Sequence, residues 1–184
     1  MKRYVASALV GILLVVTQPL LQAQGQAQDL KAEQERAIAE IKKLGGRVEV
    51  DAGSPDTPVV AVDLKHTKVM DASLGQLRGL TKLRSMYLKD TQVTDDGLVH
   101  LRGLTTIEAL ELGRTKVTDK GLEQLKGFTK LERLDLAGTE VTDKGLEHLK
   151  GLSQLRTLDL SGTKVTAAGI DAFQKALPKV KIVR

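Results

Sequence analysis

Hydrophobic and polar residues alternate between two kinds of spacing along most of the chain. In Leu131–Leu136 (LERLDL) the apolar residues stand at positions one, four and six, which indicates a short strand with one buried face. In the next stretch, Val141–Gly151, the spacing becomes helical. Both stretches recur every 24 residues, and the predicted strands begin at Leu83, Ile107, Leu131 and Leu155. We therefore predict a repeat protein in which each unit contributes one short strand and one short helix.

Five such units lie between Val59 and Pro178, with the pattern L-x-x-L-x-L-x-x-T-x-V-T-D-x-G-L-x-x-L-x-G-L. This pattern resembles the leucine-rich repeat family, and most of all the subtype that has Cys where this chain has Thr; many exported bacterial proteins carry similar units. The resemblance implies an α/β solenoid with a curved parallel sheet on its concave side and short helices on its convex side. The end units depart from the pattern, because Met70 and Ser73 replace Thr and Gly, and Ala167 replaces Asp.

Each repeated position has an expected structural role. Inward Leu and Val side chains of neighbouring units should stack into one continuous core, as in the fourth unit with Leu134, Leu136, Val141, Leu146, Leu149 and Leu152. The predicted helix N-caps are Thr118, Thr142 and Thr166. Threonines at the strand exits are expected to bond the turn backbone, and these are Thr67, Thr91, Thr115, Thr139 and Thr163. The glycines predicted to end the helices are Gly103, Gly127 and Gly151.

Both ends of the array need a cover. Residues 30–44 carry an apolar stripe and stop at a Gly pair, so we predict an N-terminal capping helix, followed by a strand at Arg47–Val50. At the other end the predicted inward residues are Ile170, Phe173, Ala176 and Leu177. The predicted divisions are a signal peptide over 1–27, a capping helix and strand over 28–58, five repeats over 59–178 and an edge strand over 179–184.

The start of the chain has the features of an export signal. Lys2 and Arg3 precede an apolar run over Val5–Val16, which is shorter than the ~20 residues that cross a bilayer. We expect cleavage after Gly25 or Ala27 and a product that is secreted or periplasmic, without stable membrane insertion. A retained membrane anchor is the alternative. The chain has no Cys, so it offers no site for a lipid on a cysteine.

Composition narrows the class of protein further. The chain has 184 residues, 41% hydrophobic and 28% charged, with two Tyr, two Phe, no Trp and no Cys. This composition excludes a multi-pass membrane protein and a disulfide framework. Two of the 28 basic residues lie in the predicted signal, which leaves 26 against 23 acidic residues and a formal charge of +3. Because both signs are interspersed, we expect no nucleic-acid partner.

Outward positions of the predicted strands form the candidate ligand-binding surface. Neighbouring strands lie ~4.8 Å apart, so equivalent residues form columns. The central column, named here the acidic column, consists of Asp63, Tyr87, Glu111, Asp135 and Asp159. The column two residues earlier contains Arg133, and the column two residues later contains Lys65 and Lys89. Carboxylates about 5 Å apart repel by ~3 kcal/mol at an effective dielectric constant near 20, which favours a cationic partner. The predicted ligand-binding residues are therefore the acidic column and Arg133.

Three origins of the acidic column stay open: a hydrated repeat consensus, a site for a protein or peptide with a basic patch, and a calcium site. We predict an exported module that binds a protein or peptide through its concave face. A structural or adhesive role in the cell envelope is the alternative, and a calcium-dependent or carboxylate-based hydrolase is remote. The sequence has no P-loop, nucleophile elbow, zinc pattern or EF-hand loop, so we predict no enzyme activity, no catalytic or metal-binding residues and no cofactor.

Overall fold

The structure, a computed structural model, describes residues 22, 25–26 and 28–184. Almost all of the predicted signal peptide, 1–27, lies outside the described residues, so the signal and its cleavage remain predictions. None of the helices in the described part combines the length and the apolar composition that crossing a membrane requires.

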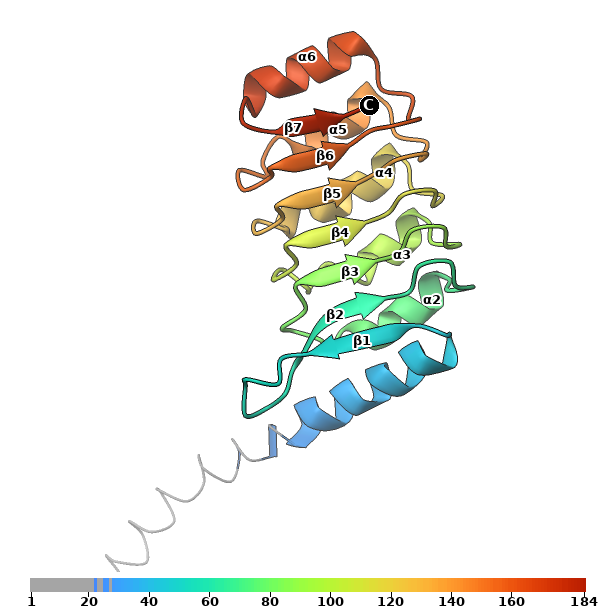
Figure 1. Cartoon of the computed structure of the whole chain (residues 1–184), viewed down its shortest axis with the longest axis vertical. Coiled ribbons are helices and arrows are strands. Elements are labelled where there is room, and N and C mark those ends of the chain that lie inside the picture. Colours follow the sequence, from blue (N-terminus) through green and yellow to red (C-terminus); the bar gives the residue numbers. More distant parts are fainter. Residues whose placement is uncertain (1–21, 23–24, 27) are drawn as a thin grey trace, which may run out of the picture.

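A sheet of seven strands runs through the molecule in the order of the sequence, as Figure 1 shows. β1 (Arg47–Val50) pairs antiparallel with β2 (Val59–Asp63), and every later pair is parallel. The later strands are β3 (Ser85–Tyr87), β4 (Ala109–Glu111), β5 (Arg133–Asp135), β6 (Thr157–Asp159) and β7 (Lys181–Val183). From β3 to β7 each strand begins 24 residues after the one before it, which confirms the predicted repeat.

Short helices pack behind the sheet, one for each unit (Figure 1). They are α2 (Asp71–Leu74), continued by the 3₁₀ helix η1 (Gly75–Leu77), α3 (Asp95–Val99), α4 (Asp119–Leu122), continued by η2 (Glu123–Gly127), α5 (Asp143–Leu149) and α6 (Ala167–Ala176). A parallel sheet on one side and short helices on the other confirm the predicted α/β solenoid.

The repeated apolar positions form one continuous core. All six inward residues named for the fourth unit are buried, and they belong to a cluster that extends from Ala37 to Val180. The predicted capping threonines are confirmed, because the side-chain oxygens of Thr118, Thr142 and Thr166 accept hydrogen bonds from backbone N–H groups of the first helical turns. Since Met70 replaces the threonine of the first unit, α2 has no side-chain cap.

Two details of the sequence analysis are wrong. α5 ends at Leu149, before Gly151, whereas Gly127 is the last residue of η2, as predicted; neither glycine has a left-handed backbone. After α4 the chain tightens into the 3₁₀ helix η2, so no left-handed cap is required there. At the last unit Ile170 and Phe173 are buried, but Ala176 is exposed. Ala176 lies about 100° around the helix from Leu177, off the stripe that faces the core.

The N-terminal helix covers residues 28–43 and lies beside β1 at the first end of the solenoid (Figure 1). Its side chains Ala37 and Ile41 are completely buried in the core, and Ile38 and Leu44 pack against it partly buried. Gly45, with φ +83°, then turns the chain into β1. This helix therefore buries its apolar stripe on the open end of the stacked units.

Candidate ligand-binding face of the sheet

The acidic column lies in register across the parallel strands. Asp63 pairs with Tyr87, Tyr87 with Glu111, Glu111 with Asp135, and Asp135 with Asp159. All five residues are partly exposed. The neighbouring column holds small residues except for Arg133, which is exposed, and Thr157. The structure thus brings together the residues that the sequence analysis selected as a binding surface.

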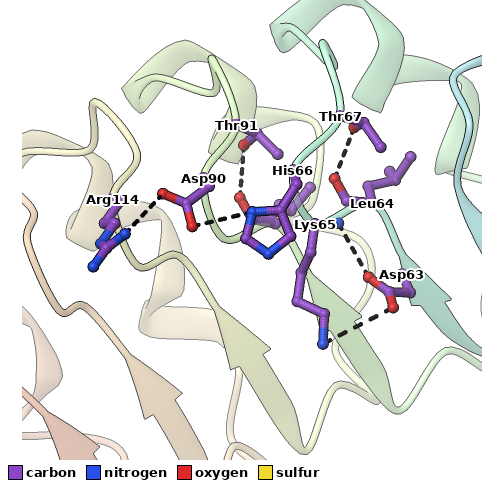
Figure 2. Close-up of polar contacts among 9 residues, drawn as sticks. Asp63, Leu64, Lys65, His66, Thr67, Asp90, Thr91 and Arg114 are labelled. Carbon is purple, nitrogen blue, oxygen red and sulfur yellow. Dashed lines mark hydrogen bonds and ion pairs between the residues drawn. The ribbon is translucent and has the colours of Figure 1, made fainter.

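Three aspartates of the acidic column have a structural role that the sequence analysis missed. Oδ1 of Asp63, Asp135 and Asp159 accepts a hydrogen bond from the backbone N–H two residues later, with N···O distances of 3.0, 2.8 and 2.9 Å. Figure 2 shows this bond at Asp63. Such a bond closes the turn after the strand. Within the described part of the chain, Tyr87 and Glu111 make no such bond, so the turn does not explain their presence in the column.

A lysine offsets part of the negative charge at the first end of the column. Lys65 Nζ lies 3.9 Å from Asp63 Oδ2 and 4.8 Å from the centre of the Tyr87 ring. A cation within about 6 Å of an aromatic ring is attracted to its face. The column is therefore partly neutralised at β2 and β3, and its least compensated carboxylates lie on β4 to β6.

A second column lies at the rim where the chain leaves the strands. His66, Asp90, Arg114, Gly138 and Gly162 occupy equivalent positions, and all have left-handed backbones with φ of 58°, 57°, 54°, 68° and 68°. Their backbones extend the sheet, since for example Asp90 N–H donates to the Gly113 carbonyl at 2.9 Å. Glycine accepts this conformation without strain, whereas side chains rarely adopt it.

The three side chains on this rim, named here the rim cluster, contact one another. Asp90 lies between the other two: its Oδ2 is 3.2 Å from His66 Nδ1, and its Oδ1 is 3.7 Å from Arg114 Nη1 (Figure 2). The sequence analysis placed His66 at a strand exit but missed Asp90 and Arg114. Alignment of the units carried the signal, because glycines occupy the same position in the last two units.

The two best-formed cavities in the part of the chain that the structure describes lie away from both columns. One, of about 440 Å³, lies between the N-terminal helix and two loops, lined by Gln34, Pro55, Thr57 and Lys82 among others. A second, of about 510 Å³, lies near Arg36 and Gln76. Among the described residues, no three His, Asp or Glu side chains lie close enough to hold a metal ion. The candidate face is an open surface.

Comparison with known proteins identifies the repeats. A family model described as "Leucine Rich repeat" matches residues 103–126, 129–150 and 152–173. These three segments are leucine-rich repeats. A search of curated proteins finds no match.

Solved structures resemble this leucine-rich repeat protein in fold. An internalin from Listeria monocytogenes is 22% identical, with a TM-score of 0.59, and the similarity covers 67% of this chain and 34% of the internalin chain. A leucine-rich repeat protein from Leptospira interrogans is 19% identical, with a TM-score of 0.46, covering 68% of this chain and 37% of that one. This chain thus spans only a little over a third of the length of these two proteins.

Proposed function

We propose that this leucine-rich repeat protein is an exported module that binds a protein or peptide on the outward face of β2 to β6. The observation that carries the proposal is the acidic column, in which four carboxylates and Tyr87 lie in register on a partly exposed surface. A partner with a basic patch would neutralise the repulsion between these carboxylates. Exposed Tyr and Arg side chains, here Tyr87 and Arg133, are enriched at protein interfaces.

The shape of the face supports a polypeptide partner rather than a small molecule. Small ligands are usually bound in concave cavities, and neither cavity found in the described residues touches the acidic column. An open row of side chains spaced by ~4.8 Å can instead contact several residues of one polypeptide in turn. Glu111 and Asp135 are both partly exposed and lie outside these two cavities, which favours binding over hydrolysis.

The column is tested with a variant that removes charge and keeps the turns. Glu111→Gln and Asp135→Asn together remove two negative charges, while the Asn oxygen still accepts the bond from Ala137 N–H. The matched control is Glu123→Gln with Glu147→Gln, because both glutamates are exposed on the helical side. Each full-length protein is immobilised and used to capture partners from envelope and medium extracts of the source cells. The affinity for every captured protein is then measured.

We expect the column variant to bind the partner at least ~10-fold more weakly, which corresponds to about 1.4 kcal/mol, and the control to bind as the native chain does. Equal affinities of the native chain and the column variant would show that the column is only a hydrated consensus. A loss in the control alone would move the interface to the helices.

The structural or adhesive alternative places the contact on the outer helices, with charges such as Glu123 and Glu147. Both carboxylates already face a lysine of the same helical segment: Glu123 Oε1 is 3.2 Å from Lys126 Nζ, and Glu147 Oε1 is 2.6 Å from Lys150 Nζ. The partner lysine also lowers the pKa of Glu123 through a side-chain hydrogen bond. These charges are matched within the helices, so the sheet face is the better candidate.

A further inference from the structure

We infer that the rim cluster of His66, Asp90 and Arg114 binds a carboxylate of an acidic peptide segment. This site lies beside the acidic column and has the opposite preference in charge. It does not depend on the proposed function, because an acidic segment can bind the rim whether or not a basic partner binds the column. The inference rests on what the fold requires at this rim and on the donors that the cluster presents.

The fold does not require these three side chains. Gly138 and Gly162 make the same left-handed turn in the last two units. The backbone contacts are also the same, since Arg114 N–H donates to Ala137 and Gly138 N–H donates to Ser161, both with N···O distances of 2.7 Å. A side chain in this conformation costs free energy that glycine avoids, and exposed ion pairs return little of it. The turn itself therefore gives no reason for these three side chains.

The geometry of the cluster orients two donors toward solvent. The Asp90 side chain is 26% exposed, whereas those of His66 and Arg114 are 69% and 70% exposed. The inner carboxylate holds one nitrogen of each neighbour, as Figure 2 shows. The guanidinium of Arg114 has five N–H donors in a planar fork, and its contact with Asp90 uses one edge. The remaining edge matches the two oxygens of a carboxylate.

The surrounding charges indicate an anion with a single charge. Arg114 is paired with Asp90, and Lys65 is paired with Asp63, so these four groups cancel. Lys89, in the column next to the rim, adds one positive charge that has no carboxylate within 4.0 Å among the described residues. Because the carboxylates of the acidic column lie beside the rim, as Asp135 does at Gly113, a singly charged carboxylate is repelled less than a doubly charged phosphate. An acidic side chain of a polypeptide is the partner group that fits this charge.

The test replaces the three side chains of the rim cluster by glycine, the residue that the last two units have at this position. The full-length variant His66→Gly, Asp90→Gly, Arg114→Gly removes the cluster and leaves the formal net charge unchanged when His is neutral. Two probes are titrated: a hexaglutamate peptide for the rim and a hexalysine peptide for the acidic column. A second variant, Arg114→Lys, keeps the charge but lacks the fork. The column variant Glu111→Gln, Asp135→Asn serves as the control for hexaglutamate.

We expect the glycine variant to bind hexaglutamate at least ~10-fold more weakly and hexalysine as the native chain does. Arg114→Lys should lose most of the hexaglutamate affinity as well, and the column variant should keep it. Unchanged hexaglutamate binding in the glycine variant, or no binding by the native chain, would overturn the inference. Inorganic phosphate that competes as well as free glutamate would overturn the preference for carboxylate. A fall of the melting temperature by more than about 4 °C in the glycine variant would make the cluster part of the fold.

Discussion

In α3 to α6, the glycine near the start of the helix leaves no room for a side chain, because an aspartate of the preceding unit lies against it. A Cβ atom placed on Gly145 would lie 2.5 Å from Asp119 Oδ1, and the corresponding contacts of Gly97, Gly121 and Gly169 are 2.4, 2.4 and 2.1 Å. Real Cβ atoms do not approach other atoms so closely. In the recurring Thr-Asp-x-Gly segment the glycine thus leaves room for the aspartate carboxylate of the preceding unit.

Substituting glycine by alanine at a crowded and at an open position distinguishes a steric effect on stability from an effect of helix propensity. We expect Gly145→Ala to lower the free energy of unfolding by about 1–3 kcal/mol, because the methyl group displaces Asp119. The control is Gly127→Ala, where no atom lies within 4 Å of the added Cβ, and it should be neutral or stabilising by up to ~1 kcal/mol. Urea unfolding measures both values. Equal destabilisation by the two substitutions would contradict the steric argument.

At the scale of the element, the aspartates bind each helix to the next one. Asp119 accepts two hydrogen bonds from Thr142 of the following unit, from the backbone N–H at 2.8 Å and from the hydroxyl at 2.7 Å. The same pair of bonds joins Asp71 to Thr94, Asp95 to Thr118 and Asp143 to Thr166. The first-turn acidic residues therefore act between units as well as on the helix dipole.

Removal of one of these links should destabilise the chain measurably. We expect Asp119→Ala to reduce the free energy of unfolding by about 1.5–3 kcal/mol, since hydrogen bonds to a charged acceptor are lost and Thr142 keeps unpaired donors. Asp96→Ala is the control, because Asp96 is exposed in the first turn of α3 and should matter by less than ~0.5 kcal/mol. Denaturant unfolding compares them, and a similar loss in both variants would refute an inter-unit role.

The last of these links gives the stability a dependence on pH. The backbone hydrogen bond from Thr166 and then its hydroxyl bond lower the pKa of Asp143 below the ordinary value of 3.8. A carboxyl whose pKa is lower in the folded state stabilises the fold above its unfolded pKa, and this contribution disappears as the pH falls through the folded value. The melting temperature of Asp143→Asn should therefore fall less steeply than that of the native chain below about pH 4. Parallel curves from pH 7 to pH 2 would disprove the link.

At the scale of the whole molecule, the features that could be predicted from the sequence are those that recur in every unit. The strands, the capping threonines and the acidic column were predicted because each recurs every 24 residues and local spacing fixes its direction. The bond from Asp119 to Thr142 was missed because it depends on how closely two units stack. The rim cluster was missed because no local pattern marks a left-handed backbone at Asp90 or Arg114. A left-handed backbone at these positions can be predicted only by aligning the units, because the last two units have glycine there.

Stacked units contact only their neighbours, so the ends of the array determine where unfolding begins. Ile41 of the N-terminal helix is completely buried against the first unit, whereas Leu30 of the same helix is 51% exposed. We expect Ile41→Ala to reduce the free energy of unfolding by about 2–5 kcal/mol through loss of burial and a cavity. We expect Leu30→Ala to change it by less than ~0.5 kcal/mol.

Hydrogen exchange shows where the loss acts. If the N-terminal helix covers the core, Ile41→Ala should speed exchange at the amides of β2 more than at those of β5, because the exposed end opens first. Leu30→Ala should leave both rates unchanged. Equal acceleration in β2 and β5 would mean that the units unfold together, and the helix would then stabilise the array as a whole instead of protecting one end. If Ile41→Ala were as mild as Leu30→Ala, the helix would not be a cap.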